Sequence, residues 1–339
     1  MSKIIKTILL LLLLSSHGLM AMKLNPEQVT ELTALANNGD AKAAYKLAVY
    51  NDKMNTQAGW KKAVLWYQIA SDAGISGATN DLAVMYFRGQ GVIRNIAKSN
   101  DLYHLASEQG SATAKYNLAK KYIAGEVLNQ NIPEGLMFLK EAVKLKHRKA
   151  IHLLATYLRE GQYVKKNELA AFKLYVHATK LRYRPSALWV ARYLEQGEVV
   201  SKNIKSAVKI YTAMALLGEA YAQERLGILY QDGEEIEQNL EQSVRFLKMA
   251  AEQGRKRAMY LLANKYYLGE GVNKDLAQAV EWYKKSAEAG YRLAQYYLGE
   301  LYASGTGVQQ DFKKACEMTE LAAAQGYEQA QINFQTFCQ

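Results

Sequence analysis

Glycines recur along this chain at an interval of 36 residues, and no other feature of the sequence restricts the fold as strongly. The first series keeps the interval without a slip: Gly89, Gly125, Gly161, Gly197, Gly233, Gly269 and Gly305. A second series has the same interval, with Lys146 and Arg182 where glycine is missing: Gly74, Gly110, Gly218, Gly254, Gly290 and Gly326. A fixed period of this length is typical of proteins built from stacked supersecondary units.

Each unit carries two apolar faces at helical spacing. In the unit that contains Ala258, Leu262 and Tyr266 follow at steps of four, and Gly269 comes three residues after the tyrosine. Residues four apart stack on one side of an α-helix, and helices often end at glycine. A second apolar face, here Trp282–Tyr283, lies before the next glycine of the second series. The pattern predicts a repeated pair of helices, which we call helix A and helix B.

One such pair cannot cover its own apolar faces, so neighbouring pairs must stack. We therefore predict an all-α fold, an α-solenoid of about eight 36-residue helix-turn-helix repeats across residues 40–327. Residues 22–39 are predicted to form an N-terminal capping helix, because Asn25 opens an Asn-Pro-Glu-Gln sequence that is typical of a helix start. Residues 328–339 are predicted to form a C-terminal capping helix.

The unit resembles the Sel-one-like repeat, most fully where Gly269, Gly271 and Val272 follow helix A. The resemblance covers residues 40–339, although units three to six place Val127, Tyr163, Val199 and Glu235 at the second glycine of this triplet. It implies a right-handed α-solenoid related to tetratricopeptide arrays, whose members are adaptors and scaffolds for protein complexes. Exported bacterial members are implicated in signalling, envelope maintenance and host contact. The family motif consists of structural positions, so it implies no catalytic residues.

Residues 1–21 have the pattern of a secretory signal peptide. Lys3 and Lys6 precede an apolar run from Thr7 to Leu14, and a small residue stands at Ala21. The run is too short to span a bilayer, and no later stretch approaches the roughly 18 apolar residues of a membrane helix. The alternative is an apolar helix that packs on the rest of the chain. We expect cleavage to leave a periplasmic or secreted chain without a transmembrane segment, with a net charge of +9 in place of +11 because two lysines are removed.

The sequence predicts no catalytic, metal or cofactor site. The Gly-x-Gly triplets follow no strand and recur with the repeat, so they are inter-helix turns rather than phosphate loops. The histidines after residue 21 are His104, His147, His152 and His177, and they form neither an i, i+4 pair nor a Cys/His cluster. We expect a protein that is not an enzyme.

Helix A positions that the core does not need are predicted to form a binding groove. If the Ala, Leu and Tyr positions point inward, positions two, six and nine residues after the Ala lie about 120 to 180 degrees away, toward the face that is usually concave in α-solenoids. The predicted groove residues are Tyr116, Lys120, His152, Arg159, Arg192, Tyr260, Asn264, Tyr267 and Tyr296. Aromatic side chains beside cations and amides are common anchors of protein interfaces. The alternative is that the tyrosines pack over neighbouring helices and the charges only solvate the edge.

Positive charge gathers in the middle of the array. Between Lys140 and Arg184 there are twelve Lys and Arg against three Glu, whereas residues 216–254 hold three against eight acidic residues. A basic edge is predicted from Lys146, Arg148, Lys149, Arg182 and Arg184. This charge favours a protein partner with an acidic surface or an acidic peptide.

Two classes of function remain open at this point. The first is an exported, non-enzymatic scaffold or adaptor that binds a protein partner in the groove. The alternative is a receptor for an anionic envelope ligand, such as a peptidoglycan fragment, a lipid headgroup or a polysaccharide. Nucleic acid is a poorer fit, because export argues against it despite the basic stretch.

The chain has two cysteines, Cys316 near the start of the last helix B and Cys338 at the end of the closing helix. These helices are expected to run antiparallel across a turn at residues 326–328, and partners in such a hairpin have residue numbers with a constant sum. The two cysteines should therefore lie level with each other. We predict a disulfide in an oxidising compartment, the alternative being two free buried thiols.

Overall fold

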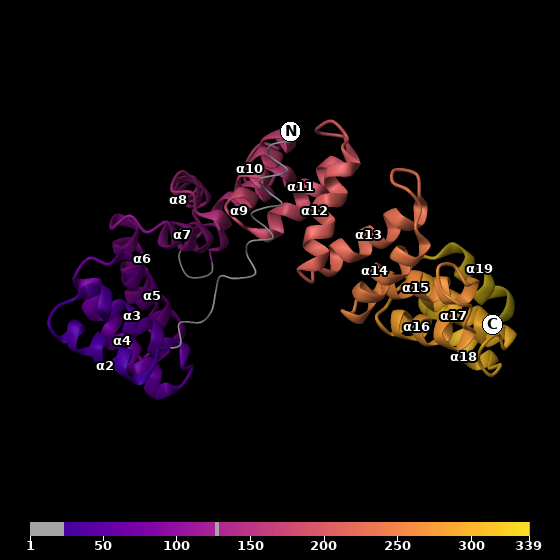
Figure 1. Ribbon diagram of the computed structural model, residues 1–339, viewed down its shortest axis with the longest axis horizontal. Helices are drawn as coiled ribbons and strands as arrows, with labels where there is room; N and C mark the ends of the chain where they lie inside the picture. Colours follow the sequence, from indigo (N-terminus) through magenta and orange to yellow (C-terminus); the bar gives the residue numbers. More distant parts are fainter. Residues whose placement is uncertain (1–23, 126–128, 339) are drawn as a thin grey trace. The chain divides into compact units, whose positions relative to one another are not determined.

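The computed structural model describes residues 24–125 and 129–338, and every helix or strand assigned within them is an α-helix (Figure 1). The helices are α2 (Pro26–Asn37), α3 (Ala41–Lys53), α4 (Gln57–Asp72), α5 (Ser76–Arg88), α6 (Ile96–Glu108), α7 (Ala112–Ala124), α8 (Ile132–Lys144), α9 (Arg148–Glu160), α10 (Glu168–Lys180), α11 (Arg184–Gln196), α12 (Ile204–Leu216), α13 (Ala220–Asp232), α14 (Leu240–Glu252), α15 (Lys256–Leu268), α16 (Leu276–Glu288), α17 (Arg292–Ser304), α18 (Phe312–Ala324) and α19 (Glu328–Phe337). Helices α3 to α18 form eight consecutive pairs, which confirms the predicted all-α repeat fold. The segment predicted as a signal peptide, residues 1–21, lies outside the described residues.

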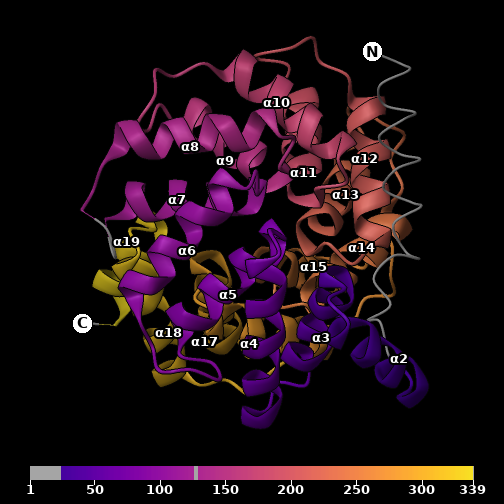
Figure 2. The same ribbon diagram turned by 90° about the vertical axis from the view of Figure 1, so that its left-hand side faces the viewer.

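The helices belong to two compact units, residues 24–186 and residues 187–338, and the division falls inside α11. We call them the N-terminal unit and the C-terminal unit. Each helix packs against the next one along the chain from α2 to α10 and from α12 to α19. Figure 2 shows this arrangement for α8, α9 and α10 of the N-terminal unit, which lie side by side.

Within each unit, the core lies between the two helices of a pair and between successive pairs. In the C-terminal unit, Ala258 and Leu262 of α15 are fully buried, and Trp282 and Tyr283 of α16 pack in the same cluster. The face of helix A that the sequence predicts to point inward is thus the buried face. Tyr266, the third residue of that face, packs against this cluster while partly exposed.

A capping residue repeats together with the core. From the second repeat onward the N-cap of helix B is Asn or Asp: Asn95, Asn131, Asn167, Asn203, Asn239, Asp275 and Asp311. The side chain of Asp275 accepts a hydrogen bond from the Gln278 backbone N–H at 2.9 Å. The backbone N–H of Asp275 donates to the carbonyl of Tyr266 at the end of α15, also at 2.9 Å. A side-chain cap of this kind stabilises a helix by about 1 kcal/mol. These Asn and Asp residues therefore mark the start of helix B, and their backbone N–H groups connect it to helix A.

The first glycine series occupies the left-handed region, with φ between 68° and 79° at all seven positions. Glycine adopts this conformation without steric cost, which is why helix A ends there. Where the second series lacks glycine, Lys146 and Arg182 adopt the same region, with φ of 59° and 61°. Tyr163, which replaces a triplet glycine, does so too, with φ of 61°. These turns therefore keep their left-handed residue although its side chain has changed.

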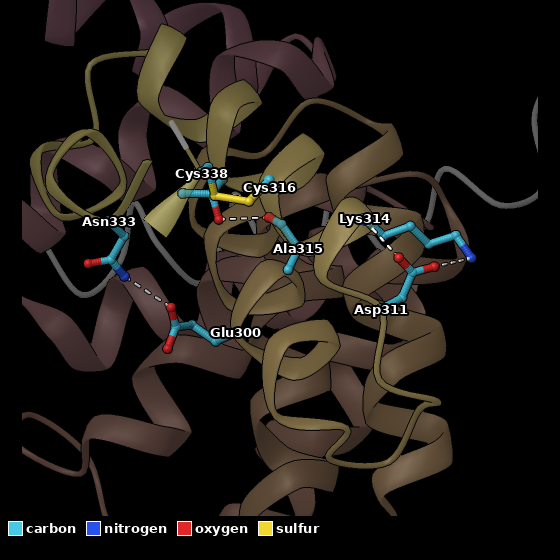
Figure 3. The surroundings of a disulfide bond; sticks show 8 residues. Glu300, Asp311, Lys314, Ala315, Cys316, Asn333 and Cys338 are labelled. Carbon is cyan, nitrogen blue, oxygen red and sulfur yellow. Dashed lines mark hydrogen bonds and ion pairs between the residues drawn. A yellow bond between two sulfur atoms is a disulfide. The ribbon is translucent and has the colours of Figure 1, made fainter. Parts of the chain in front are cut away.

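The closing helix α19 is held to the last repeat by covalent and polar contacts. Cys316 of α18 and Cys338 at the end of α19 form a disulfide, with Cα atoms 5.5 Å apart (Figure 3). The side-chain amide of Asn333 donates to the carboxylate of Glu300 on α17 at 3.1 Å. Helix α19 therefore contacts both helices of the last pair.

Candidate functional site

Side chains on one helix A contact the residue that precedes the next helix A, 31 positions further along the chain. Ring centroids are 4.9 Å apart for Tyr116 and His147, 5.1 Å for His152 and Tyr183, 5.3 Å for Tyr260 and Tyr291, and 5.0 Å for Tyr296 and Tyr327. These distances are typical of favourable aromatic pairs. We call this series of contacts the 31-residue ladder. The first residue of each of these four pairs is a predicted groove residue. Its ring packs against the ring of the second residue and remains partly exposed.

One step of the ladder is ionic. Arg255 donates to Glu224 from Nε at 3.0 Å and from Nη2 at 2.9 Å, at the positions where other repeats hold two rings. The Glu224 side chain is only 3% exposed, whereas the Arg255 side chain is 39% exposed. A carboxylate buried this deeply requires a charged, hydrogen-bonded partner, which Arg255 provides.

Four predicted groove residues of the C-terminal unit lie in one hollow of about 820 Å³: Tyr260, Asn264, Tyr267 and Tyr296. Three further tyrosines line it: Tyr283 of α16, Tyr297 of α17 and Tyr327 in the α18–α19 turn. Tyr291, which precedes α17, packs against Tyr260. We call this the tyrosine hollow. Its rings are close enough to support one another, with centroids 5.8 Å apart for Tyr260 and Tyr297 and 5.4 Å apart for Tyr296 and Tyr297.

Apart from Glu300, the polar side chains that line the tyrosine hollow are uncharged. The hydroxyl of Tyr283 donates to the side-chain carbonyl of Asn264, and the amide of Asn333 donates to the hydroxyl of Tyr296 at 3.3 Å. Burial raises the pKa of Tyr260 to about 12 and also raises the pKa of Tyr283. Because both phenols stay protonated near neutral pH, this part of the lining presents ring faces and uncharged hydrogen-bonding groups.

A second hollow of the C-terminal unit, of about 670 Å³, is lined mainly by charged side chains. We call it the arginine pocket, and its charged lining residues are Arg192, Arg225, Arg255, Lys256, Arg257, Glu195 and Glu224. Arg225 pairs with Glu195, whose carboxylate also accepts a hydrogen bond from Tyr211 at 2.8 Å. The predicted groove residue Arg192 is exposed, with its guanidinium 5.2 Å from the ring of Trp189.

The N-terminal unit has a smaller hollow of about 400 Å³ beside Lys120. Phe87 and Tyr103 supply aromatic faces there, and the ammonium of Lys121 lies 3.8 Å from the ring centre of Phe87. Lys120 itself is exposed. This arrangement places a cation beside aromatic rings.

The other predicted residues of the N-terminal unit have separate surroundings. His152 shares a hydrogen bond between Nδ1 and the Ser186 hydroxyl at 2.9 Å, and Arg159 contacts the carboxylate of Glu160 at 2.5 Å. On the predicted basic edge, four side chains are exposed and Arg184 is half-buried; the exposed ones are Lys146, Arg148, Lys149 and Arg182. Lys146 and Arg182 occupy equivalent turns of two successive repeats, and Arg148 and Lys149 begin α9. The structure therefore distributes the predicted groove residues over several sites.

Sequence reasoning missed the partners of the predicted groove. The column that directly follows the second glycine series includes His147, Tyr183, Arg255, Tyr291 and Tyr327, and these are the second members of the 31-residue ladder. Its four rings, at His147, Tyr183, Tyr291 and Tyr327, were a visible signal. It was not used, because these residues stand in turns rather than on a helix face.

Neither a metal-binding cluster nor a membrane-spanning helix is found in residues 24–125 and 129–338. No cluster of three or more His, Cys, Asp or Glu side chains there is arranged to hold a metal ion. None of the helices described has the length and apolar character needed to cross a membrane.

Known proteins share this architecture. A family model for the Sel1 repeat matches eight segments of the chain, residues 41–75, 76–111, 112–147, 148–181, 185–219, 220–254, 256–291 and 292–327. The crystal structure of a Sel1 repeat protein from Oxalobacter formigenes superposes with a TM-score of 0.65 at 23% sequence identity, over 97% of this chain and 92% of that one. The protective antigen c5321 of uropathogenic Escherichia coli, which displays the same type of repeat fold, gives a TM-score of 0.37 at 20% identity, over 92% and 90% of the two chains. No curated protein sequence matches the chain.

Proposed function

Because this chain belongs to the Sel1 repeat family, whose model covers eight of its helix pairs, we propose that it is a non-enzymatic scaffold that holds a protein partner in the tyrosine hollow. Sel1 repeats generally mediate protein–protein interactions, and the helix pairs supply a rigid frame for a binding surface. The observation that carries the proposal is the gathering of tyrosines from three helices around one hollow.

Tyrosine suits such a surface for physical reasons. Its ring buries a large apolar area at a small cost in conformational entropy, and its hydroxyl satisfies polar groups of the partner. In the tyrosine hollow the rings of Tyr260, Tyr296 and Tyr297 also hold one another in place. Tyr297 is 40% exposed, so an apolar face is available for a partner. A preordered aromatic surface loses little freedom when it binds.

The proposal places the protein outside the cytoplasm, in the periplasm or secreted. The support is the signal-peptide pattern of residues 1–21 together with the pairing of Cys316 and Cys338. A fusion of residues 1–30 to a reporter that is active only after export tests this part on its own. Export is expected, and retention of the fusion in the cytoplasm would contradict it.

Partner binding is tested with the double variant Tyr260→Ala and Tyr296→Ala. The matched control is Tyr230→Ala with Tyr266→Ala. These half-buried tyrosines also belong to A-type helices but do not line the hollow. A partner is first isolated from envelope extract on immobilised wild-type protein and then purified. The hollow variant is expected to weaken its binding by about 2 kcal/mol or more, roughly thirtyfold in Kd.

The control variant is expected to bind the purified partner within about threefold of the wild type. Far-UV circular dichroism of both variants verifies that the helices remain. Equal losses in the two variants, or wild-type binding by the hollow variant, would place the partner elsewhere.

A further inference from the structure

The arginine pocket is chemically unlike the equivalent positions of other repeats. Glu224 and Arg255 form an ionic step in a ladder that elsewhere pairs rings. Glu195 and Arg225 form a second ion pair beside it, and the equivalent positions two repeats later are Tyr267 and Tyr297. Since tyrosines fill these positions in the same fold, packing alone does not require two buried ion pairs in one repeat.

The pocket keeps an excess of positive charge after its internal pairs are formed. Both carboxylates in the lining are occupied, Glu195 by Arg225 and Glu224 by Arg255. The other three cations that line the pocket, Arg192, Lys256 and Arg257, are exposed and have no carboxylate partner within the described part of the chain. A hollow with a net positive charge attracts ligands of negative charge.

One side chain that lines the pocket has a donor without a partner. The Nε–H group of Arg225 is buried and makes no hydrogen bond, while the Nη2 group of the same side chain is held by Glu195. A buried charged donor without a partner is unfavourable, so packing alone does not explain an arginine at this position. The ion pairs also restrict the guanidinium groups of Arg225 and Arg255 before any ligand arrives.

We propose that the arginine pocket binds clustered carboxylate side chains on an acidic segment of a protein partner, an inference that rests on the proposed scaffold function. Guanidinium groups match carboxylates in geometry and are weakly hydrated, so they bind them well at a partly buried surface. The cations come from α11, α13 and the start of α15, which suits several carboxylates along a peptide better than a single compact anion. The rings of Tyr221 and Tyr291 provide an apolar wall for the peptide chain.

The pocket can be tested without knowing the partner. The probes are a fluorescein-labelled hexaglutamate peptide and its hexaglutamine counterpart, measured by fluorescence anisotropy against the full mature chain at low ionic strength. The pocket variant is Arg192→Gln with Arg257→Gln, two exposed side chains that make no ion pair. The matched control is Lys248→Gln with Lys313→Gln, which removes the same charge from exposed positions outside the pocket. A third variant, Lys146→Gln with Lys149→Gln, removes it from the basic edge.

The wild type is expected to bind hexaglutamate and not hexaglutamine. The pocket variant should lose at least tenfold in affinity, and the other two variants should stay within about twofold. An equal loss in all three variants would mean general charge attraction and would overturn the proposal. A loss of affinity confined to the basic-edge variant would overturn it as well. The proposal would also be wrong if inorganic phosphate, at matched ionic strength, competed more strongly than unlabelled hexaglutamate.

This assay and the partner assay can fail independently. Hexaglutamate binding does not involve Tyr260 or Tyr296, so the Tyr260→Ala with Tyr296→Ala variant should retain it. If hexaglutamate fails to bind while partner binding depends on the tyrosines, only the inference about the arginine pocket is wrong. If hexaglutamate binds as expected and the tyrosine variant binds the partner normally, only the tyrosine hollow is wrong as the binding site.

Discussion

A Cβ atom placed on Gly271 would lie 2.4 Å from the carbonyl carbon and oxygen of Leu240, at the start of α14 in the preceding repeat. The turn after α15 therefore touches the backbone of the preceding helix B, and only glycine leaves room for the contact. Gly91 has the same relationship to Trp60, with a shortest distance of 2.4 Å. The triplet glycine thus connects successive repeats and does more than end a helix.

Gly271→Ala is expected to lower the free energy of unfolding by about 3 kcal/mol, because left-handed strain adds to a clash with main-chain atoms that cannot move aside. Gly290→Ala is the matched control, since Gly290 has a φ of 74° and no neighbour within 4 Å of an added Cβ. Its cost should be about 1 kcal/mol, from backbone strain alone. Urea unfolding of the two variants gives the comparison, and equal costs would show that the contact with Leu240 relaxes.

Much of the fold is predictable because each weak sequence signal for a helix or a turn recurs in several repeats. A single Ala-Leu-Tyr face such as that of Ala258 is weak evidence, but the recurrence of similar faces with the Gly269 series along the chain predicts both helices and both turns. The Asn and Asp column that caps helix B was equally regular in the sequence and could have been recognised. Periodicity cannot show which side chains meet across repeats, because that depends on the displacement from one pair to the next.

The candidate site shows this limit. Tyr260 and Tyr296 were predicted from helix A geometry, and the structure places them in one hollow. Arg255 was not predicted, because it lies in a turn, and its contact with Glu224 spans 31 residues rather than a helical interval. The overall charge of residues 216–254 is acidic, yet Glu224 and Arg225 of this segment line the arginine pocket, whose two carboxylates are both paired with arginines.

His147 is expected to make stability depend on pH. Burial, followed by the charges of Lys149 and Arg148, lowers the pKa of His147 from 6.5 to about 4 in the folded chain. Its neutral Nδ1 accepts the N–H of Ala150 at 3.3 Å and caps α9. As pH falls, the unfolded chain takes up the proton first, so the stabilisation is present above about pH 6.5 and is lost progressively toward pH 4.

His147→Asn keeps a capping side chain and removes this titration. Between about pH 7.5 and pH 4.5 the wild type should lose roughly 1 kcal/mol more stability than the variant, a figure reduced from the full shift because His147 is partly exposed. Urea unfolding of both proteins at the two pH values measures the difference. An identical pH dependence would mean that the folded chain accepts the proton on His147 without cost.

The disulfide is expected to stabilise the C-terminal end of the chain. It joins residues 22 positions apart, and closing a loop of that size stabilises by about 3 kcal/mol in the chain-entropy model. Helix α19 has no side-chain N-cap, so it depends on this tether and on its packing. Thiol alkylation of protein purified from the periplasm should label no cysteine without reductant and two with it. Two labelled thiols without reductant would contradict the bridge.

The ionic step of the ladder separates stability from binding. Arg255→Ala leaves the nearly buried Glu224 without its cation and is expected to lower the free energy of unfolding by about 3 kcal/mol. The double variant Glu224→Tyr with Arg255→Tyr recreates the ring pair of Tyr260 and Tyr291 and should return to within about 1 kcal/mol of the wild type, because apolar packing can replace a buried ion pair.

The net charge of this double variant equals that of the wild type, since it removes one cation and one anion. If Arg255 contributes to carboxylate binding, the variant should bind hexaglutamate several-fold more weakly although its stability has recovered. Urea unfolding and fluorescence anisotropy on the same preparations measure the two quantities. Recovered stability with wild-type affinity would assign the ion pair to packing alone and leave the binding of acidic segments to Arg192, Arg225 and Arg257.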